Sequence, residues 1–197
     1  MCGIIGYIGT KITANLLIRG LQRLEYRGYD SAGMAVHNND GSFYVSKEVG
    51  RVQELEKIVD LTQTEGAGIA HTRWATHGGV TVENAHPHLS QCGNVVLVHN
   101  GIIKNFSPLR QKLQESGYTF QSETDSEVIA HLIANLYNGH SAFGEKDAST
   151  ETKGNPLEAI RSALRFTRGT WGVAVMFADI PNEIFAARNG SPLVIGF

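Results

Sequence analysis

The second residue of the chain, Cys2, carries a side chain that can act as a nucleophile. Its small size permits removal of Met1, after which Cys2 would own a free α-amino group. An α-amine has an ordinary pKa of about 7.7–8.0, so a useful fraction is neutral near pH 7 and can accept the thiol proton. One residue would then supply both the nucleophile and its base. From position alone, a structural role as a small buried residue at the start of an edge strand is the commoner one.

Two charged side chains are candidates for binding a charged ligand. Arg73 follows an apolar strand-like stretch, and its guanidinium could grip a carboxylate with two hydrogen bonds. A surface arginine whose stem covers apolar area is an equal alternative. Asp125 precedes a predicted helix, where it could bind a substrate ammonium, although an interaction with the helix dipole is the commoner role there.

The pair Asn100-Gly101 lies between two apolar runs, which is a strong signal for a hairpin turn. A side-chain amide beside a glycine N–H can also form an oxyanion hole. A tight turn would fix both donors, so the two interpretations are compatible.

Histidine is frequent in the same region, which raises the possibility of a metal site. The histidines concerned are His71, His77, His86, His88 and His99. None of them forms the i, i+4 helical pair of metalloproteases, so we expect no bound metal. The two cysteines, Cys2 and Cys92, fit no zinc spacing, and Cys92 lies in a turn-like stretch where we expect no role.

The composition is that of one globular domain or a small pair, with 42% hydrophobic and 18% charged residues in 197. A net charge of −2 indicates neither nucleic acid nor an anionic membrane as partner. No apolar run is long enough for a membrane span, and the N-terminus lacks the basic start of a secretory signal. We therefore expect a cytoplasmic protein.

Residue patterns predict strands that occur in runs and helices that occur in pairs. The expected strands are 2–8, 32–37, 43–49, 68–74, 95–99, 173–177 and 184–187, and the expected helices are 12–26, 52–59, 108–116, 128–136 and 157–166. This order favours antiparallel sheets covered by helices over a doubly wound parallel fold.

Several local features accompany these elements. Residues 124–127 have the capping-box pattern, Pro181 marks a turn, and 139–155 form a polar loop that we expect to be mobile. Residues 192–197 have the composition of the middle of a strand.

Six segments together resemble a known family. They are Cys2-Gly3-Ile4, Leu24–Gly33, His71–Gly78, Asn84–His88, His99–Ile103 and Ser122–Asp125, in the family's order. They are similar to the glutaminase domains of glutamine–fructose-6-phosphate aminotransferases, which are class II glutamine amidotransferases and N-terminal-nucleophile hydrolases. The resemblance implies an α+β four-layer sandwich, with two antiparallel sheets between helical layers.

The resemblance also implies a role for each matching residue. Cys2 would attack the side-chain amide of L-glutamine, and Asn100 with the Gly101 N–H would form the oxyanion hole. Arg73 would bind the α-carboxylate and Asp125 the α-ammonium. The remaining positions would line the glutamine pocket (Thr76, His77), shape the surroundings of the nucleophile (Arg27) and gate the release of ammonia toward a partner domain (Trp74). No cofactor is implied.

The resemblance makes residues 1–197 a single type-2 glutamine amidotransferase domain, incomplete at its C-terminal end. The sugar-phosphate isomerase domains that would use the ammonia to make glucosamine 6-phosphate from fructose 6-phosphate are absent. Two alternatives stay open: the glutaminase part of another class II amidotransferase, and a catalytically silent glutamine-binding fragment.

Overall fold

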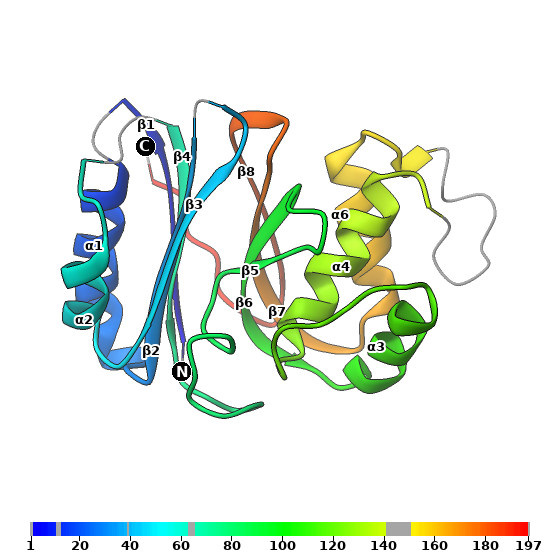
Figure 1. Cartoon of the computed structure of the whole chain (residues 1–197), viewed down its shortest axis with the longest axis horizontal. Coiled ribbons are helices and arrows are strands. Elements are labelled where there is room, and N and C mark those ends of the chain that lie inside the picture. The colour runs from blue at the N-terminus through cyan, green and yellow to red at the C-terminus, as the bar shows by residue number, and fades with distance from the viewer. Residues whose placement is uncertain (1, 11–12, 39, 63–65, 141–150, 197) are drawn as a thin grey trace.

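The computed structural model describes residues 2–10, 13–38, 40–62, 66–140 and 151–196. Within these ranges the strands form two four-stranded antiparallel sheets that face each other (Figure 1). The first sheet has the order β1 (Gly3–Gly9), β4 (Gly66–Arg73), β2 (Ser31–His37), β3 (Phe43–Val49). The second has the order β5 (His88–Leu89), β6 (Val95–Ile103), β7 (Gly169–Phe177), β8 (Ile180–Asn189).

Helices cover the outer face of each sheet, as Figure 1 shows. The first sheet is covered by α1 (Thr13–Leu24) and α2 (Val52–Ile58), and a 3-10 turn (Glu25–Arg27) follows α1. The second is covered by α3 (Phe106–Glu115), α4 (Ser126–Tyr137) and α6 (Pro156–Phe166). The predicted four-layer α+β sandwich is therefore confirmed.

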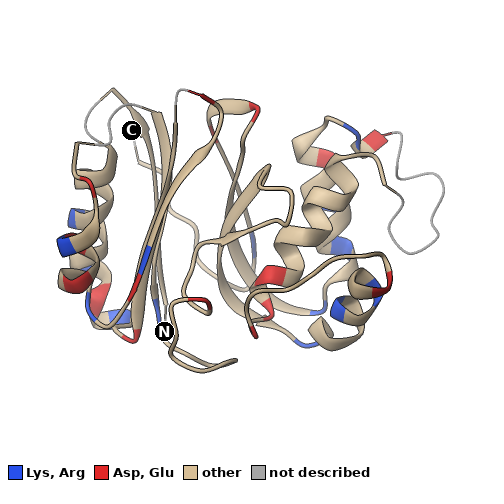
Figure 2. Cartoon of the chain, in the orientation of Figure 1, with Lys and Arg blue, Asp and Glu red and all other residues tan. Residues whose placement is uncertain are grey.

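Three apolar layers hold the sandwich together. Helix α1 repeats apolar residues at helical spacing, so one face, which includes Leu17 and Leu21, packs on the first sheet. A thin layer that includes Ile69 and Val98 fills the space between the sheets. Every residue of α4 is buried, because this helix packs on the second sheet and is flanked by α3 and α6. Charged residues gather on the outer helices and loops, as Figure 2 shows.

The Asn100-Gly101 pair is not a turn, so this prediction is wrong. Strand β6 runs through both residues and pairs with β7 from Val95 to Ile103. Gly101 is needed for close packing instead: its φ is +141°, and a Cβ there would lie 2.0 Å from the Thr170 carbonyl oxygen. Pairing along the whole strand overrides the local turn signal.

Two other local predictions are wrong, and a third falls largely outside the described residues. Strand β7 joins β8 at residues 178–179, so Pro181 lies inside β8, an edge strand that tolerates proline. Residues 192–196 form no strand, and Val194 is 89% exposed. Of the predicted loop at 139–155, residues 141–150 lie outside the described residues, as does Met1.

The capping box at residues 124–127 forms only in part. The Glu127 backbone N–H lies 3.4 Å from the Thr124 hydroxyl, as the motif requires. The Glu127 carboxylate, however, turns away and accepts hydrogen bonds from the backbone N–H groups of Gln121 and Ser122. The Glu127 carboxylate thus fixes the loop before α4 instead of hydrogen-bonding back to the backbone N–H at the start of its own helix.

Candidate active site

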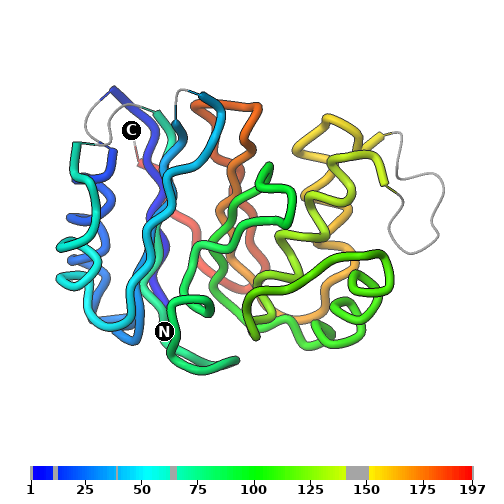
Figure 3. Tube along the Cα trace, viewed as in Figure 1, coloured from blue at the N-terminus to red at the C-terminus, as the bar shows by residue number. Residues whose placement is uncertain are grey.

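Cys2 lies where the first strand meets the end of β4. Because Gly3 pairs with Thr72, the preceding residue comes beside Arg73 and Trp74. The Trp74 backbone N–H donates to Cys2 Sγ at 3.2 Å, and the Trp74 carbonyl oxygen lies 3.6 Å from the same sulfur. In Figure 3 the N-terminal end of the trace lies beside the segment that follows β4. The thiol is therefore held by backbone groups of one residue.

The electrostatic surroundings of this thiol favour its protonated form. Burial raises the pKa of Cys2, and this effect exceeds the opposing influence of the Trp74 N–H and of the Arg73 charge. A thiol in this environment needs a base to become a strong nucleophile. The α-amine of Cys2, once exposed, is the base that the sequence predicts.

Arg73, the last residue of β4, is only 4% exposed, which excludes the alternative of a surface arginine. Its guanidinium donates to the carbonyl oxygens of Gly79 at 2.9 Å, of Gly78 at 3.4 Å and of His77. The loop after β4 thus curls around the guanidinium. Three of five N–H donors are used in this way, which leaves donors for a ligand.

Asp30, which was not assigned a role from the sequence, fixes the turn between Arg73 and this loop. Its carboxylate accepts the Ala75 backbone N–H at 2.8 Å, and its own N–H donates to the Arg73 carbonyl at 3.1 Å. Trp74 lies between these two contacts. Asp30 thereby positions the backbone group that touches the Cys2 sulfur.

Asn100 approaches Cys2 from the second sheet. The Asn100 Nδ2 donates to the Cys2 carbonyl oxygen at 3.2 Å, and Arg27 Nε donates to the same oxygen at 3.2 Å. Asn100 and Arg27 therefore both contact the backbone of the predicted nucleophile, and the roles assigned to them stay predictions.

The Gly101 N–H faces the open edge of β6. Backbone N–H groups of alternate residues in a strand point to the same side. The His99 N–H bonds to His86 Nδ1 and the Ile103 N–H bonds to Asp125 Oδ2, both on the side away from β7. Gly101 lies between them, so its N–H points to that side too. Strand β5 is too short to cover it, because it pairs only with Val96 and Leu97.

Asp125 lies at the start of α4 and is 5% exposed. Its Oδ2 accepts the Ile103 N–H at 2.7 Å, while Oδ1 lies 3.5 Å from the Ser126 hydroxyl. It makes no side-chain cap hydrogen bond to the helix. In the part of the chain that the structure describes, no ion pair joins Asp125 to Arg73 or to any other basic group.

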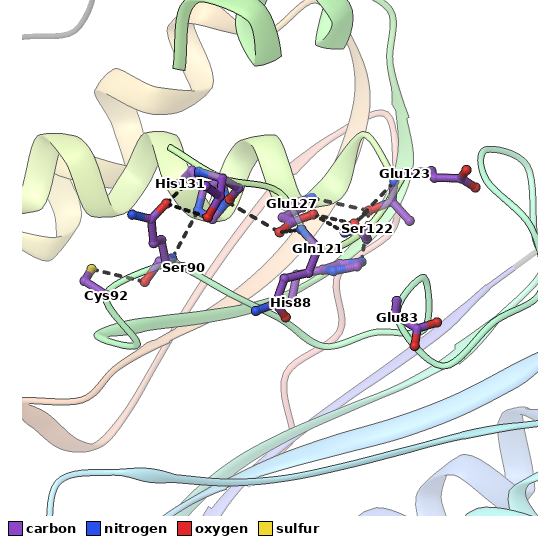
Figure 4. A network of polar contacts seen from close by, with 12 residues as sticks. Glu83, His88, Ser90, Cys92, Gln121, Ser122, Glu123, Glu127 and His131 are labelled. Atoms are coloured by element: carbon purple, nitrogen blue, oxygen red, sulfur yellow. Dashed lines mark hydrogen bonds and ion pairs between the residues drawn. The ribbon is translucent and has the colours of Figure 1, made fainter. Parts of the chain in front are cut away.

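A buried network fixes the segment that carries Asp125 (Figure 4). The Glu127 carboxylate accepts the N–H groups of Gln121 at 2.8 Å and Ser122 at 2.7 Å, as well as the Ser122 hydroxyl at 2.6 Å. His131 Nε2 lies 3.4 Å from it. Burial alone would raise the pKa of Glu127, but these donors together lower it to about 2. Glu127 is therefore a charged anchor for the loop before α4.

One small pocket collects most of the predicted residues. It is lined by seven of them, namely Cys2, Arg73, Trp74, Thr76, His77, Gly101 and Asp125, and by four that sequence reasoning did not assign, namely His86, His99, Thr124 and Ser126. Asn100 and Arg27 do not line this pocket but contact Cys2 directly. The pocket therefore contains a thiol, a cation and an anion, with an amide behind the thiol.

Four buried histidines support this pocket. Burial lowers the pKa of His71 and His88 to about 3, and it also lowers that of His86 and His99, so all four are neutral at pH 7. Their rings bond to backbone groups, hydroxyls or the Asn100 amide. Among the described residues, no group of three or more potential ligands is arranged to hold a metal.

The sequence similarities agree with this geometry. Residues 58–143 match the family described as glutamine amidotransferase domain. The whole chain is 50% identical to a glutamine–fructose-6-phosphate aminotransferase (isomerizing) from Chlorobaculum tepidum and 47% identical to one from Idiomarina loihiensis. The chain spans about 30% of the length of these relatives.

Solved structures with the same fold point to the same family. The glutamine phosphoribosylpyrophosphate amidotransferase of B. subtilis, complexed with ADP and GMP, superposes with a TM-score of 0.73 at 26% identity. That match covers 96% of this chain and 37% of the other. A structure described as the allosteric regulatory enzyme of purine biosynthesis gives a TM-score of 0.70 at 28% identity, covering 90% and 36%. The chain therefore belongs to the glutamine amidotransferases.

Proposed function

We propose that this chain hydrolyses the side-chain amide of L-glutamine to glutamate and ammonia, with the Cys2 thiol as nucleophile. The observation that carries the proposal is that Arg73 and Asp125, both buried and not paired with each other, line the same pocket as Cys2. A buried charge needs a partner. The α-carboxylate and α-ammonium of glutamine supply one partner for each, which leaves the side-chain amide to meet the thiol.

The first step makes the thiol reactive. With Met1 removed, the α-amine of Cys2 accepts the thiol proton, and the Trp74 N–H stabilises the resulting thiolate at 3.2 Å. Sulfur then attacks the amide carbon, a C–S bond forms, and the carbonyl oxygen becomes an oxyanion. The Gly101 N–H, which faces the open edge of β6, and the Asn100 amide are the donors we assign to it.

The second step releases ammonia. As the tetrahedral intermediate collapses, the C–N bond breaks, and the protonated α-amine gives its proton to the departing nitrogen. A γ-glutamyl thioester remains on Cys2. Water then attacks this thioester, the C–S bond breaks, and glutamate leaves with the thiol restored.

The other predicted residues support these steps. Arg27 holds the Cys2 carbonyl, so the backbone of the nucleophile cannot swing away from the pocket. Thr76 and His77 line the pocket beside the guanidinium of Arg73. Trp74 is 45% exposed and stacks edge-on against Tyr29 at 5.5 Å, a position suited to a gate at the exit.

A finer proposal concerns the use of the ammonia. We propose that a longer protein containing this chain delivers it to a sugar-phosphate isomerase domain, which makes glucosamine 6-phosphate from fructose 6-phosphate. Its support is the identity of about half of all residues with isomerizing aminotransferases. As for location, none of the described helices is both long and apolar enough to cross a membrane, and we propose a cytoplasmic protein.

The test compares the two cysteines. Glutamate and ammonia release should disappear in Cys2→Ala and stay near the wild-type rate in Cys92→Ala, because Cys92 does not line the pocket and its thiol hydrogen-bonds to Ser90, Asn94 and Asn138. Glutamine binding should survive in both. Full activity in Cys2→Ala, or its loss only in Cys92→Ala, would overturn the proposed mechanism.

A further inference from the structure

The amide of Asn100 is held between two groups from the first sheet. Its Nδ2 lies 3.2 Å from the Cys2 carbonyl oxygen, and its Oδ1 lies 2.9 Å from His71 Nε2. The Cys2 carbonyl can only accept a hydrogen bond, so the amide NH₂ must face it. The amide oxygen then faces His71, and His71 must donate from Nε2.

His71 is suited to be a fixed donor. It lies in the interior of β4, pairs with Ile4 and Gly33 on either side, and is 1% exposed. Its ring stacks on His86, with 4.1 Å between centroids and 19° between planes. Because burial lowers its pKa to about 3, the ring is neutral at pH 7 and carries one proton. The contact with Asn100 requires that proton on Nε2.

We propose that His71 is a positioning residue that sets the orientation of the Asn100 amide, so that its NH₂ group faces the reacting centre. This inference rests on the proposed function of Cys2 and Asn100. The contact crosses between the sheets, since His71 belongs to β4 and Asn100 to β6 (Figure 1). The packing of the two sheets thereby fixes one donor of the oxyanion hole.

The physical reason is the two-fold ambiguity of an asparagine side chain. Rotation by 180° exchanges the amide oxygen and nitrogen with almost no change in shape. The flipped form presents Oδ1 to the Cys2 carbonyl and to the developing oxyanion, and both contacts would then join two acceptors. A donor at His71 Nε2 adds to the preference for the other form.

The experiment uses two amide substitutions that differ only in reach. In His71→Gln the amide extends to the place of Nε2 and can still donate to Asn100. In His71→Asn the side chain is one methylene shorter and cannot. We expect His71→Gln to stay within a few-fold of wild type. In His71→Asn, kcat for glutamine should fall by more than about 10-fold, up to the roughly 10²–10³-fold cost of losing an oxyanion donor. The KM should change little.

The matched control is His37→Asn. His37 is also buried, and its ring bonds to the carbonyls of Asn38 and Ala178 at the opposite end of β2 from Cys2. It should lower the melting temperature without changing kcat. Alkylation of Cys2 by iodoacetamide, read by peptide mass, forms a C–S bond and expels iodide with no oxyanion. Its rate should therefore be unchanged in His71→Asn.

A double mutant separates positioning from general damage. If His71 acts through Asn100, His71→Asn should cost almost nothing further in an Asn100→Ala background. Equal costs in both backgrounds, or slowed alkylation matching the fall in kcat, would overturn the inference. If the wild type releases no glutamate, or Cys2→Ala keeps its activity, the proposed function fails instead. Activity in the wild type together with unchanged kcat in His71→Asn would refute the role of His71 alone.

Discussion

Replacing Arg73 by alanine should remove the recognition of the glutamine carboxylate. The guanidinium is 4% exposed, so a bound carboxylate would be shielded from water there. Truncating one partner of such a pair costs about 2–5 kcal/mol. At about 1.36 kcal/mol per tenfold change, kcat/KM should fall by roughly 30-fold to 5,000-fold. Arg73→Lys should recover only part, because an ammonium cannot reproduce the two-pronged contact.

The same substitution also removes one hydrogen-bond donor from each of three loop carbonyls, which makes a competing explanation possible. Two of them belong to Gly78 and Gly79, which are exposed, so water can replace the lost donors. We therefore expect a stability cost near the low end of the range for unmade hydrogen bonds, about 1 kcal/mol. The lost carboxylate contact should dominate.

The assay compares glutamine with 4-aminobutanamide, which lacks the α-carboxylate but keeps the amide and the ammonium. Wild type should hydrolyse 4-aminobutanamide slowly, and Arg73→Ala should hydrolyse it at a similar rate. The large loss should occur with glutamine only. An equal fractional loss for both substrates would mean that Arg73 acts only through the loop, and its role in carboxylate binding would be refuted.

Further predictions follow from the same geometry. An uncleavable extension before Cys2 should abolish glutamine hydrolysis, and proteolytic exposure of Cys2 should restore it. Activity should then rise through about pH 7–8, where an α-amine ordinarily titrates. Equal rates with and without the extension would exclude the amine as base. Asp125→Asn should lower kcat/KM for glutamine but hardly for 4-carbamoylbutanoate, which lacks the ammonium; equal losses for both would argue against ammonium binding. The pKa of Glu127 is lowered from 4.5 to about 2, so its contribution to stability is complete above about pH 4.5 and is lost as the pH falls toward 2. Urea denaturation of Glu127→Gln should therefore show lower stability at pH 7 and a weaker acid dependence, and an unchanged acid profile would count against this assignment. Gly101→Ala should unfold at a markedly lower temperature, because its Cβ would lie 2.0 Å from the Thr170 oxygen.

The spacing of apolar residues predicted most of the helices and strands, because many of these elements bury one apolar face. The spacing of Leu17 and Leu21 marks the buried face of α1, and the aromatic and β-branched residues at 43–45 favour the edge strand β3. Where local signals failed, pairing partners distant in sequence decided the outcome. Asn100-Gly101 is extended because β7 pairs along it, and Pro181 lies within an edge strand because the turn falls two residues earlier.

The candidate site shows the same division. Residue type and motif order indicated the thiol, the guanidinium, the carboxylate and the amide, since each chemistry belongs to a recognisable side chain. Asp30, Glu127 and His71 carried no comparable signal. Their roles consist of hydrogen bonds to backbone or side-chain groups of other segments, which spacing along the chain does not encode.

The sequence by itself determined which groups are available: a thiol near the chain start, one cation and one anion for a zwitterion, and elements suited to two antiparallel sheets. Only the tertiary structure decided how those groups are oriented. Cys2 meets Trp74 through the pairing of β1 with β4, and it meets Asn100 only because the second sheet packs on the first. Direction in a hydrogen bond depends on both partners, and here the partners lie in different layers of the sandwich.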